Sequence, residues 1–321
     1  MLRVHFSESD IDRLTVADAA DPMWELLTSV YRLQRPEGEQ VFGRWRETSR
    51  PAVPGSVTRL LDAIPPYGYC PDFLTPSEFG GDLADGLAAL ARTPESALRG
   101  DIAAFAAERN RLPKWLRKIA HGDGHELQTL ADTAYEYFRQ CIGPHWPTIT
   151  RAVDRERDRC REALQRGGPH LLLSTLHPDV RWRPPVLEVR FPVEQDLHLR
   201  GRGLRLLPSF FCHGMPTTYK DATRSPALVY SIDHQPSPAA IAEPGAALSA
   251  LLGHTRARIL VAVAATECNT SQLAERTNTA IATASSHASI LRAGGLIEST
   301  RSGKSTVHTI TPLGLAVIKA G

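Results

Sequence analysis

The side chains between Ala280 and Arg292 suit contact with a nucleic-acid duplex. Ala284, Ala288 and Leu291 recur at i, i+4 and i+7, which predicts a helix with one buried stripe. The residues expected to contact DNA are Ala282, Thr283, Ser285, Ser286, His287, Ser289 and Arg292. Hydroxyl groups bond to phosphates or base edges, and small methyl groups contact thymine methyls. For His287 two interpretations stay open, a phosphate contact and packing beneath the helix.

A preceding helix, a turn and a glycine end must hold this helix in place. Residues 270–276 predict a short preceding helix. Asn278 suits the turn between the helices, because Asn tolerates a left-handed backbone better than other residues that carry a side chain. Gly294 and Gly295 predict the end of the second helix, since glycine accepts a positive φ without steric cost.

A hairpin is expected after the helices. Residues 296–300 and 305–310 predict two strands, and the polar segment between them predicts the hairpin tip. This tip carries Arg301 and Lys304, which we expect to contact the DNA backbone. Helix, turn, helix and basic hairpin together predict a DNA-binding unit.

This arrangement resembles the winged helix-turn-helix of ArsR-type regulators. The resemblance rests on residues 252–260, on Thr283-Ala284-Ser285-Ser286-His287 and on residues 291–297. It implies that the helix from Ala280 is a recognition helix in the major groove. It also implies that the hairpin around Gly303 is a wing.

The chain departs from the ArsR pattern at identifiable positions. Thr277 and Thr279 stand where apolar turn residues are common. Family members often carry a metal-binding cysteine pair before the recognition helix, but here only Cys268 lies near, so the resemblance does not extend to metal sensing. The whole chain also resembles actinobacterial regulators in which a long amino-terminal domain of uncharacterised function precedes an ArsR-type DNA-binding domain. Residues 24–27 and 201–211 carry this second likeness.

Charge is distributed unevenly along the 321 residues. Seven Lys and Arg residues and three Glu residues follow Ala246, a net charge of +4. The total is +2, so the rest of the chain carries −2. The positive end coincides with the predicted DNA-binding unit, as phosphate binding requires.

Composition and motifs limit the classes of protein and the cellular compartments that the sequence allows. The five cysteines are scattered and form no paired framework, which predicts a reducing compartment, the cytoplasm. No apolar run approaches the roughly 18 residues of a membrane span, and no signal-peptide pattern is found. Candidate ligands are scattered or interrupted by Gly and Pro, so no metal is expected. No phosphate loop or nucleophile motif occurs, so we expect no cofactor and no enzyme.

The predicted fold class is α+β. We expect an amino-terminal helical region with a small antiparallel sheet, followed by the winged helix-turn-helix. Residues 22–34 predict a helix, and residues 35–56 predict an exposed loop or irregular stretch. Gly167, Gly168 and Pro169 predict the end of a helical run. The predicted domains are residues 1–235 for effector binding or assembly, 236–246 as a linker, and 247–321 for DNA binding.

Several aromatic residues of the amino-terminal domain could line an effector cavity, or could simply belong to its core. They are Trp24, Tyr31, Phe210, Phe211 and Tyr230. We expect a homodimeric transcriptional repressor that binds double-stranded DNA and a small organic effector, with no membrane partner. Two other classes stay open: a winged-helix scaffold for protein interactions, and an amino-terminal enzyme with a regulatory DNA-binding domain.

Overall fold

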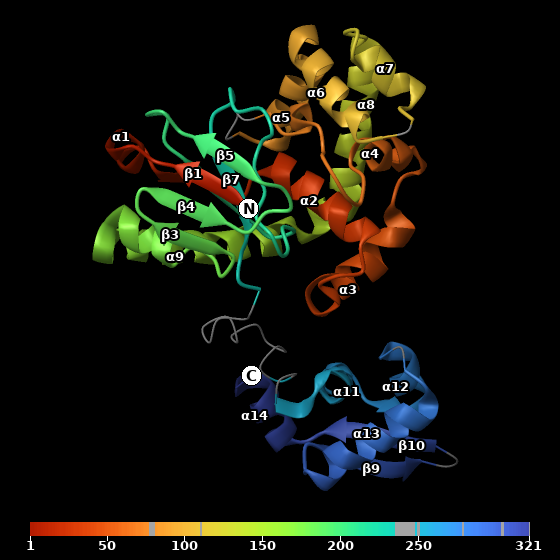
Figure 1. Cartoon of the computed structure of the whole chain (residues 1–321). Helices are drawn as coiled ribbons and strands as arrows, with labels where there is room; N and C mark the ends of the chain where they lie inside the picture. Colours follow the sequence, from red (N-terminus) through yellow and green to blue (C-terminus); the bar gives the residue numbers. More distant parts are fainter. Residues whose placement is uncertain are drawn as a thin grey trace. The chain divides into compact units, whose positions relative to one another are not determined.

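The computed structural model describes residues 1–76, 81–109, 111–234, 248, 251–277, 279–302 and 305–320. The chain forms two compact units, Met1–His234 and Gln235–Gly321 (Figure 1). Both units combine helices with small sheets, which confirms the α+β class. The predicted linker, residues 236–246, lies outside the described residues. Among the helices of the described part, none is long and apolar enough to cross a membrane.

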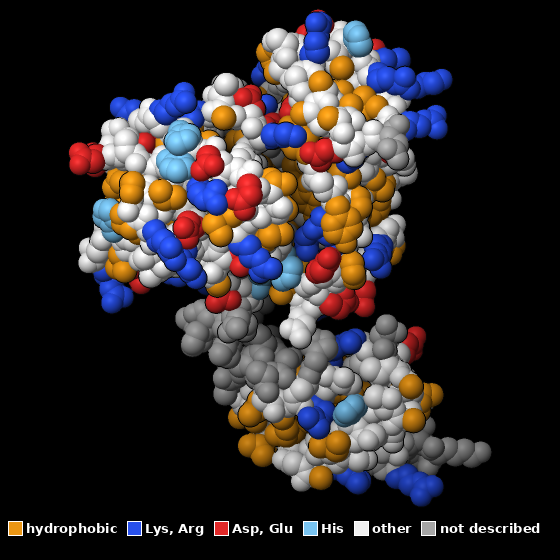
Figure 2. All heavy atoms as spheres, in the orientation of Figure 1, with side chains coloured by type: hydrophobic (Ala, Val, Ile, Leu, Met, Phe, Trp, Pro, Cys, Tyr) orange, Lys and Arg blue, Asp and Glu red, His pale blue; other side chains and the backbone are white. Residues whose placement is uncertain are grey.

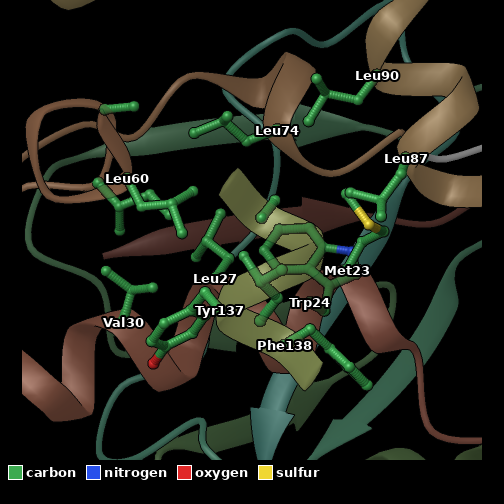
Figure 3. Packing of buried hydrophobic residues seen from close by; sticks show 14 of the residues in the cluster. Met23, Trp24, Leu27, Val30, Leu60, Leu74, Leu87, Leu90, Tyr137 and Phe138 are labelled. Atoms are coloured by element: carbon green, nitrogen blue, oxygen red, sulfur yellow. The ribbon is translucent and has the colours of Figure 1, made fainter. Parts of the chain in front are cut away.

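Helix α2 (Pro22–Gln34) lies at the centre of the larger core of the first unit. Asp21 begins it by accepting hydrogen bonds from the amides of Met23 and Trp24, and Pro22 occupies the first turn. Its apolar side chains pack against residues of α4, α5 and α8 (Figure 3). The other helices of this unit are α1 (Glu8–Asp12), α3 (Glu39–Ser49), α4 (Thr58–Ala63), α5 (Leu83–Ala91), α6 (Glu95–Ala107), α7 (Lys114–Ile119), α8 (Gly124–Tyr137) and α9 (Trp146–Ser174).

The prediction of an irregular stretch over residues 35–56 was wrong, because α3 occupies much of it. Phe42 and Trp45 lie three residues apart and are both buried, so α3 presents one face to the core. The Trp45 ring nitrogen donates to the carbonyl of Cys141, 2.8 Å away. These tertiary contacts outweigh the local signals from glycine and charge.

Two sheets complete the first unit. One has the order β3-β4-β1-β5 and the other the order β2-β6-β7. Their strands are β1 (Leu2–His5), β2 (Thr15–Val16), β3 (Val180–Arg183), β4 (Val186–Val189), β5 (Gln195–His198), β6 (Arg205–Ser209) and β7 (Ala227–Ser231).

The prediction of a small antiparallel sheet was only partly right. Strands β3, β4 and β1 are antiparallel, but β1 and β5 are parallel, and so are all pairs of the second sheet. Residues 210–226 carry the chain from the end of β6 back to the start of β7, which a parallel pair requires. Strand β1 inserts between two strands that follow it by more than 180 residues, a pairing that no local pattern encodes.

Helix α9 packs against the four-stranded sheet and forms the second core of this unit. Leu2 and Val4 alternate along β1 and are fully buried there. The predicted end of a helical run at Gly167 and Gly168 is a kink in α9, because both residues have non-helical backbone angles and a separate helical segment leads from there to Ser174.

The second unit has the order α11 (His254–Ala265), β8 (Cys268–Asn269), α12 (Thr270–Arg276), α13 (Ile281–Ala293), β9 (Ile297–Ser302), β10 (Ser305–Ile310) and α14 (Pro312–Ala320) (Figure 1). Its three strands form an antiparallel sheet with β10 in the middle. Its core is Leu248, Ala257, Ile259, Leu260, Val263, Cys268, Leu273, Ala274, Ala284, Ala288, Leu291, Leu296 and Ile297. The two predicted helices and two predicted strands of this region are therefore present.

Candidate nucleic-acid interface

Helix α12 and the turn after it position α13. Asn269 begins α12 through a reciprocal pair of hydrogen bonds with Gln272, at 2.9 and 3.0 Å. The Thr277 hydroxyl donates to the Leu273 carbonyl at 2.7 Å and lies 3.0 Å from the Thr279 hydroxyl. The Thr277 hydroxyl thus satisfies a carbonyl at the end of α12 and the Thr279 hydroxyl bonds to it, which explains why this turn is not apolar. Asn278 lies outside the described residues.

Helix α13 has two distinct faces. Ala284, Ala288 and Leu291 are buried, which confirms the predicted stripe. Gly295 follows the helix with φ +70°, as predicted for its end. The predicted contact residues that are exposed are Ala282, Thr283, Ser285, Ser286, Ser289 and Arg292. Side chains able to contact a groove therefore share one face of the helix.

His287 differs from the other predicted contact residues of α13. Its side chain is half-buried, and Nδ1 is enclosed with no hydrogen-bond partner among the described residues. This placement favours packing beneath the helix over a phosphate contact, the second interpretation of the sequence.

The start of α13 is open to an anion. Its N-cap residue is Ala280, and no side chain of the described part caps the first-turn amides. Unpaired amides at a helix N-terminus attract phosphate through their hydrogen atoms and the helix dipole.

The arginines of this unit divide into two groups. Arg256, Arg258 and Arg276 donate to backbone carbonyls of Leu252, Thr277 and Thr266. Arg292 and Arg301 are exposed and donate to no acceptor among the described residues. Figure 2 shows basic side chains on the visible face of this unit. Arg301 lies on β9 opposite Thr306, and Lys304 lies outside the described residues.

Sequence reasoning missed the role of His308. This residue of β10 is buried, its Nε2 lies 3.1 Å from the Thr270 hydroxyl, and its Nδ1 lies 2.8 Å from the Ser299 hydroxyl. It therefore links the start of α12 to both strands of the hairpin. A histidine in an alternating strand gives no local signal for this, because its partners lie 38 and 9 residues away.

We expect the second unit to lose stability in mild acid through His308. Burial, with a contribution from Arg292, lowers the pKa of His308 below 6.5, so folding favours the neutral ring. The stabilisation is complete above pH 6.5 and is lost as the pH falls toward the lower folded-state pKa. Hydrogen exchange of peptides from residues 251–320, corrected for intrinsic rates, measures the change. The variant His308→Gln should lose this pH dependence and His121→Gln should keep it; equal slopes in all three proteins would contradict the assignment.

The five aromatic residues predicted around an effector do not meet in one place. Trp24 and Phe211 belong to the larger core, and Tyr31 and Phe210 are partly buried against it. Tyr230 belongs instead to the core beneath the four-stranded sheet. Trp24 lines a cavity of about 20 Å³, which has room for about one water molecule. A wider surface depression of about 440 Å³ contains none of the five and is lined by Arg117, Lys118, His121 and Asp123.

The described residues contain no group of three or more His, Cys, Asp or Glu side chains arranged to hold a metal ion. Cys268 is buried in the second unit, and burial raises the pKa of its thiol. This disfavours the thiolate that a metal requires.

Comparisons with known proteins assign no function to this interface. No protein-family model, no curated protein and no solved structure matches the chain.

Proposed function

We propose that the chain is a DNA-binding transcriptional regulator whose carboxyl-terminal unit is a winged helix-turn-helix of the ArsR type. The observation that carries the proposal is the two-sided character of α13. One side is packed into a core, and the other exposes hydroxyl and methyl groups together with Arg292. Arg301 on the adjoining hairpin supplies a second unpaired cation for the DNA backbone.

The proposal assigns different roles to the two parts of this surface. Helix α13 reads base edges in the major groove, and the β9–β10 hairpin holds the phosphate backbone as a wing. The absence of Lys and Arg between Ala280 and Leu291 means that bidentate guanine reading is not offered by the middle of α13. Recognition therefore depends on hydroxyl contacts, thymine methyl contacts and the shape of the duplex.

We also propose that the regulator acts as a homodimer and as a repressor. Helices α11 and α14 contact each other, and three apolar side chains on them are exposed, Val261, Leu313 and Leu315. Apolar side chains on adjoining helices favour a symmetric contact with a second copy. A dimer would also double the modest net charge of +4 that each copy brings to DNA.

The function is tested by selecting genomic fragments with the purified full-length chain and sequencing them. A shared, palindromic motif in the bound fragments is the expected result, because a dimer reads two half-sites. Recovery of fragments without a common motif would refute sequence-specific regulation. Capture of proteins without any retained DNA would instead support the alternative that the winged helix is a scaffold for protein interactions.

We expect the double variant Arg292→Ala with Arg301→Ala to bind every duplex more weakly, on the order of tenfold at low salt. Each lost phosphate contact makes the slope of log K against log salt shallower by about 0.9. Fluorescence anisotropy over a salt series measures both quantities. The matched control is Arg155→Ala with Arg166→Ala, which removes two exposed arginines from α9.

The variant Ser286→Ala separates specificity from general affinity. It should leave the salt slope unchanged and alter the preference among related sites by about fivefold, or about 1 kcal/mol. For the variant that lacks both Arg292 and Arg301, an unchanged salt slope would rule out phosphate contacts by both residues. It would therefore also rule out the wing assignment.

A further inference from the structure

Three arginines lie near the turn between α2 and α3: Arg32, Arg35 and Arg46. Arg46 is buried, and its terminal nitrogens donate to the carbonyls of Arg35, Pro36 and Glu37 at 2.9–3.5 Å. It also lies 3.3 Å from the exposed Glu39 carboxylate. Arg46 is thus occupied in holding the turn between the two helices.

Arg32 is equally buried but has no such role. Its side chain is 4% exposed, yet it donates no hydrogen bond and lies within 4.0 Å of no carboxylate in the part of the chain that the structure describes. Its Nε is fully enclosed, whereas its two terminal nitrogens keep a small exposed area. Its guanidinium carbon lies 6.0 Å from the centre of the Phe42 ring.

The surroundings of Arg32 are positive and aromatic. Arg35 stacks on Tyr31 and Tyr67, and its Nε is also enclosed without an acceptor among the described residues. His213 is exposed, and its ring lies 5.6 Å from that of Phe42. Partial burial of the ring, then the charges of Arg32 and Arg46, lower the pKa of His213, which places this ring in the field of both arginines.

The nearby carboxylates do not neutralise this cluster. Glu25 is buried and accepts from the amides of Phe210 and Phe211, at 2.6 and 3.0 Å. Glu37 and Glu39 are exposed, where solvent weakens their attraction. A buried guanidinium without an acceptor is unfavourable, and a carboxylate or a phosphate satisfies it with two parallel hydrogen bonds.

We propose that Arg32, with Arg35 and His213 beside it, binds the oxyanion group of a small ligand, a carboxylate or a phosphate. Tyr31 and Phe210 adjoin the cluster and offer partly exposed aromatic surface to the rest of that ligand. These two residues were among those expected from the sequence to contact an effector. The proposal concerns the first unit alone and does not depend on DNA binding.

The test is isothermal titration of the full-length chain with sodium benzoate and with sodium phosphate, against sodium chloride at equal ionic strength. We expect saturable binding of one anion per chain. Tighter binding of benzoate identifies an organic carboxylate held against aromatic rings, and tighter binding of phosphate identifies a phosphate group. Arg32→Met should weaken anion binding at least tenfold. Arg32→Lys should weaken it less, because lysine keeps the positive charge but lacks the paired donors of the planar guanidinium. Arg44→Met, on the exposed side of α3, is the matched control.

A second measurement separates a ligand site from a structural arginine. Without added anion, Arg32→Met should unfold at the same temperature as the wild type or higher, since methionine fills the space without an unpaired charge. A lower unfolding temperature or a misfolded variant would overturn the proposal. So would the lack of saturable binding of either anion, or binding that Arg32→Met leaves unchanged.

Discussion

Replacement of Glu25 by alanine is expected to destabilise the first unit by about 2–6 kcal/mol, because it leaves two backbone donors without an acceptor. The Glu25 side chain is fully buried and accepts from the Phe210 amide, the Phe211 amide and the Ser209 hydroxyl. It thereby fixes the chain where β6 ends and ties that end to α2. Each buried donor left unpaired costs about 1–3 kcal/mol.

Tryptophan fluorescence during chemical unfolding measures this effect on the first unit alone. All five tryptophans precede residue 235, so the signal contains nothing from the second unit. Glu47→Ala removes an exposed carboxylate from α3 and serves as the control. A change below 1 kcal/mol in Glu25→Ala would show that the amides find other partners.

Glu25 should also make the stability of the first unit depend on pH. Burial raises its pKa to about 7, against the opposing effect of the three hydrogen bonds, and Asp21 adds to the increase. A raised carboxyl pKa means that folding favours the protonated form. Its stabilising contribution is complete below about pH 4.5 and is lost as the pH rises to about 7. Glu25→Gln, which cannot ionise, should remove this dependence.

Replacement of Gly314 by alanine is expected to destabilise the second unit by about 3 kcal/mol, at the upper end of the usual cost of overpacking. An added Cβ would overlap the carbonyl oxygen of Leu296 and lie 2.6 Å from Cδ1 of Ile310. The carbonyl cannot move freely, because it accepts from the amide of Thr311 at 3.2 Å. The Thr311 hydroxyl in turn accepts from the Gly314 amide at 3.0 Å. This contact docks the start of α14 on Leu296, the residue before β9.

Gly294 provides the matched control for Gly314. Its added Cβ would meet the nearest atoms at 3.6 Å, an ordinary contact, and its φ of −79° suits any residue. Hydrogen exchange of peptides from residues 251–320 should therefore show a large loss of protection in Gly314→Ala and little in Gly294→Ala. Equal protection in the two variants would contradict the described docking of α14.

Local sequence signals predicted the elements whose causes are local. Pro22 and the apolar spacing that follows predict a helix over residues 22–34, which is the extent of α2. The stripe of Ala284, Ala288 and Leu291 and the glycine after it predict α13 and its end. Each of these depends on residues within a few turns of one another.

Features that depend on distant residues could not be predicted in this way. The insertion of β1 between β4 and β5, the parallel pairing of β6 with β7, and the burial of α3 all require the assembled fold. The same holds for the side chains of His308 and Arg32. Histidine and arginine are common surface residues, and only their burial and the distances to partners mark them out.

The proposed function depends on the outer face of α13 contacting DNA. The most direct test places two negative charges there, in the variant Ser285→Glu with Ser286→Glu of the full-length chain. Both positions are exposed, so folding should be retained. Ser96→Glu with Ala97→Glu makes the same charge change at exposed positions of α6.

Binding to the selected genomic duplex and to a shuffled duplex is then measured by anisotropy across a salt series. The wild type and the α6 control should bind the selected duplex about a thousandfold or more tighter than the shuffled one. The α13 variant should lose this preference and most of its affinity, because its carboxylates repel the phosphates. Unchanged binding of the selected duplex by the α13 variant would contradict the proposed DNA interface.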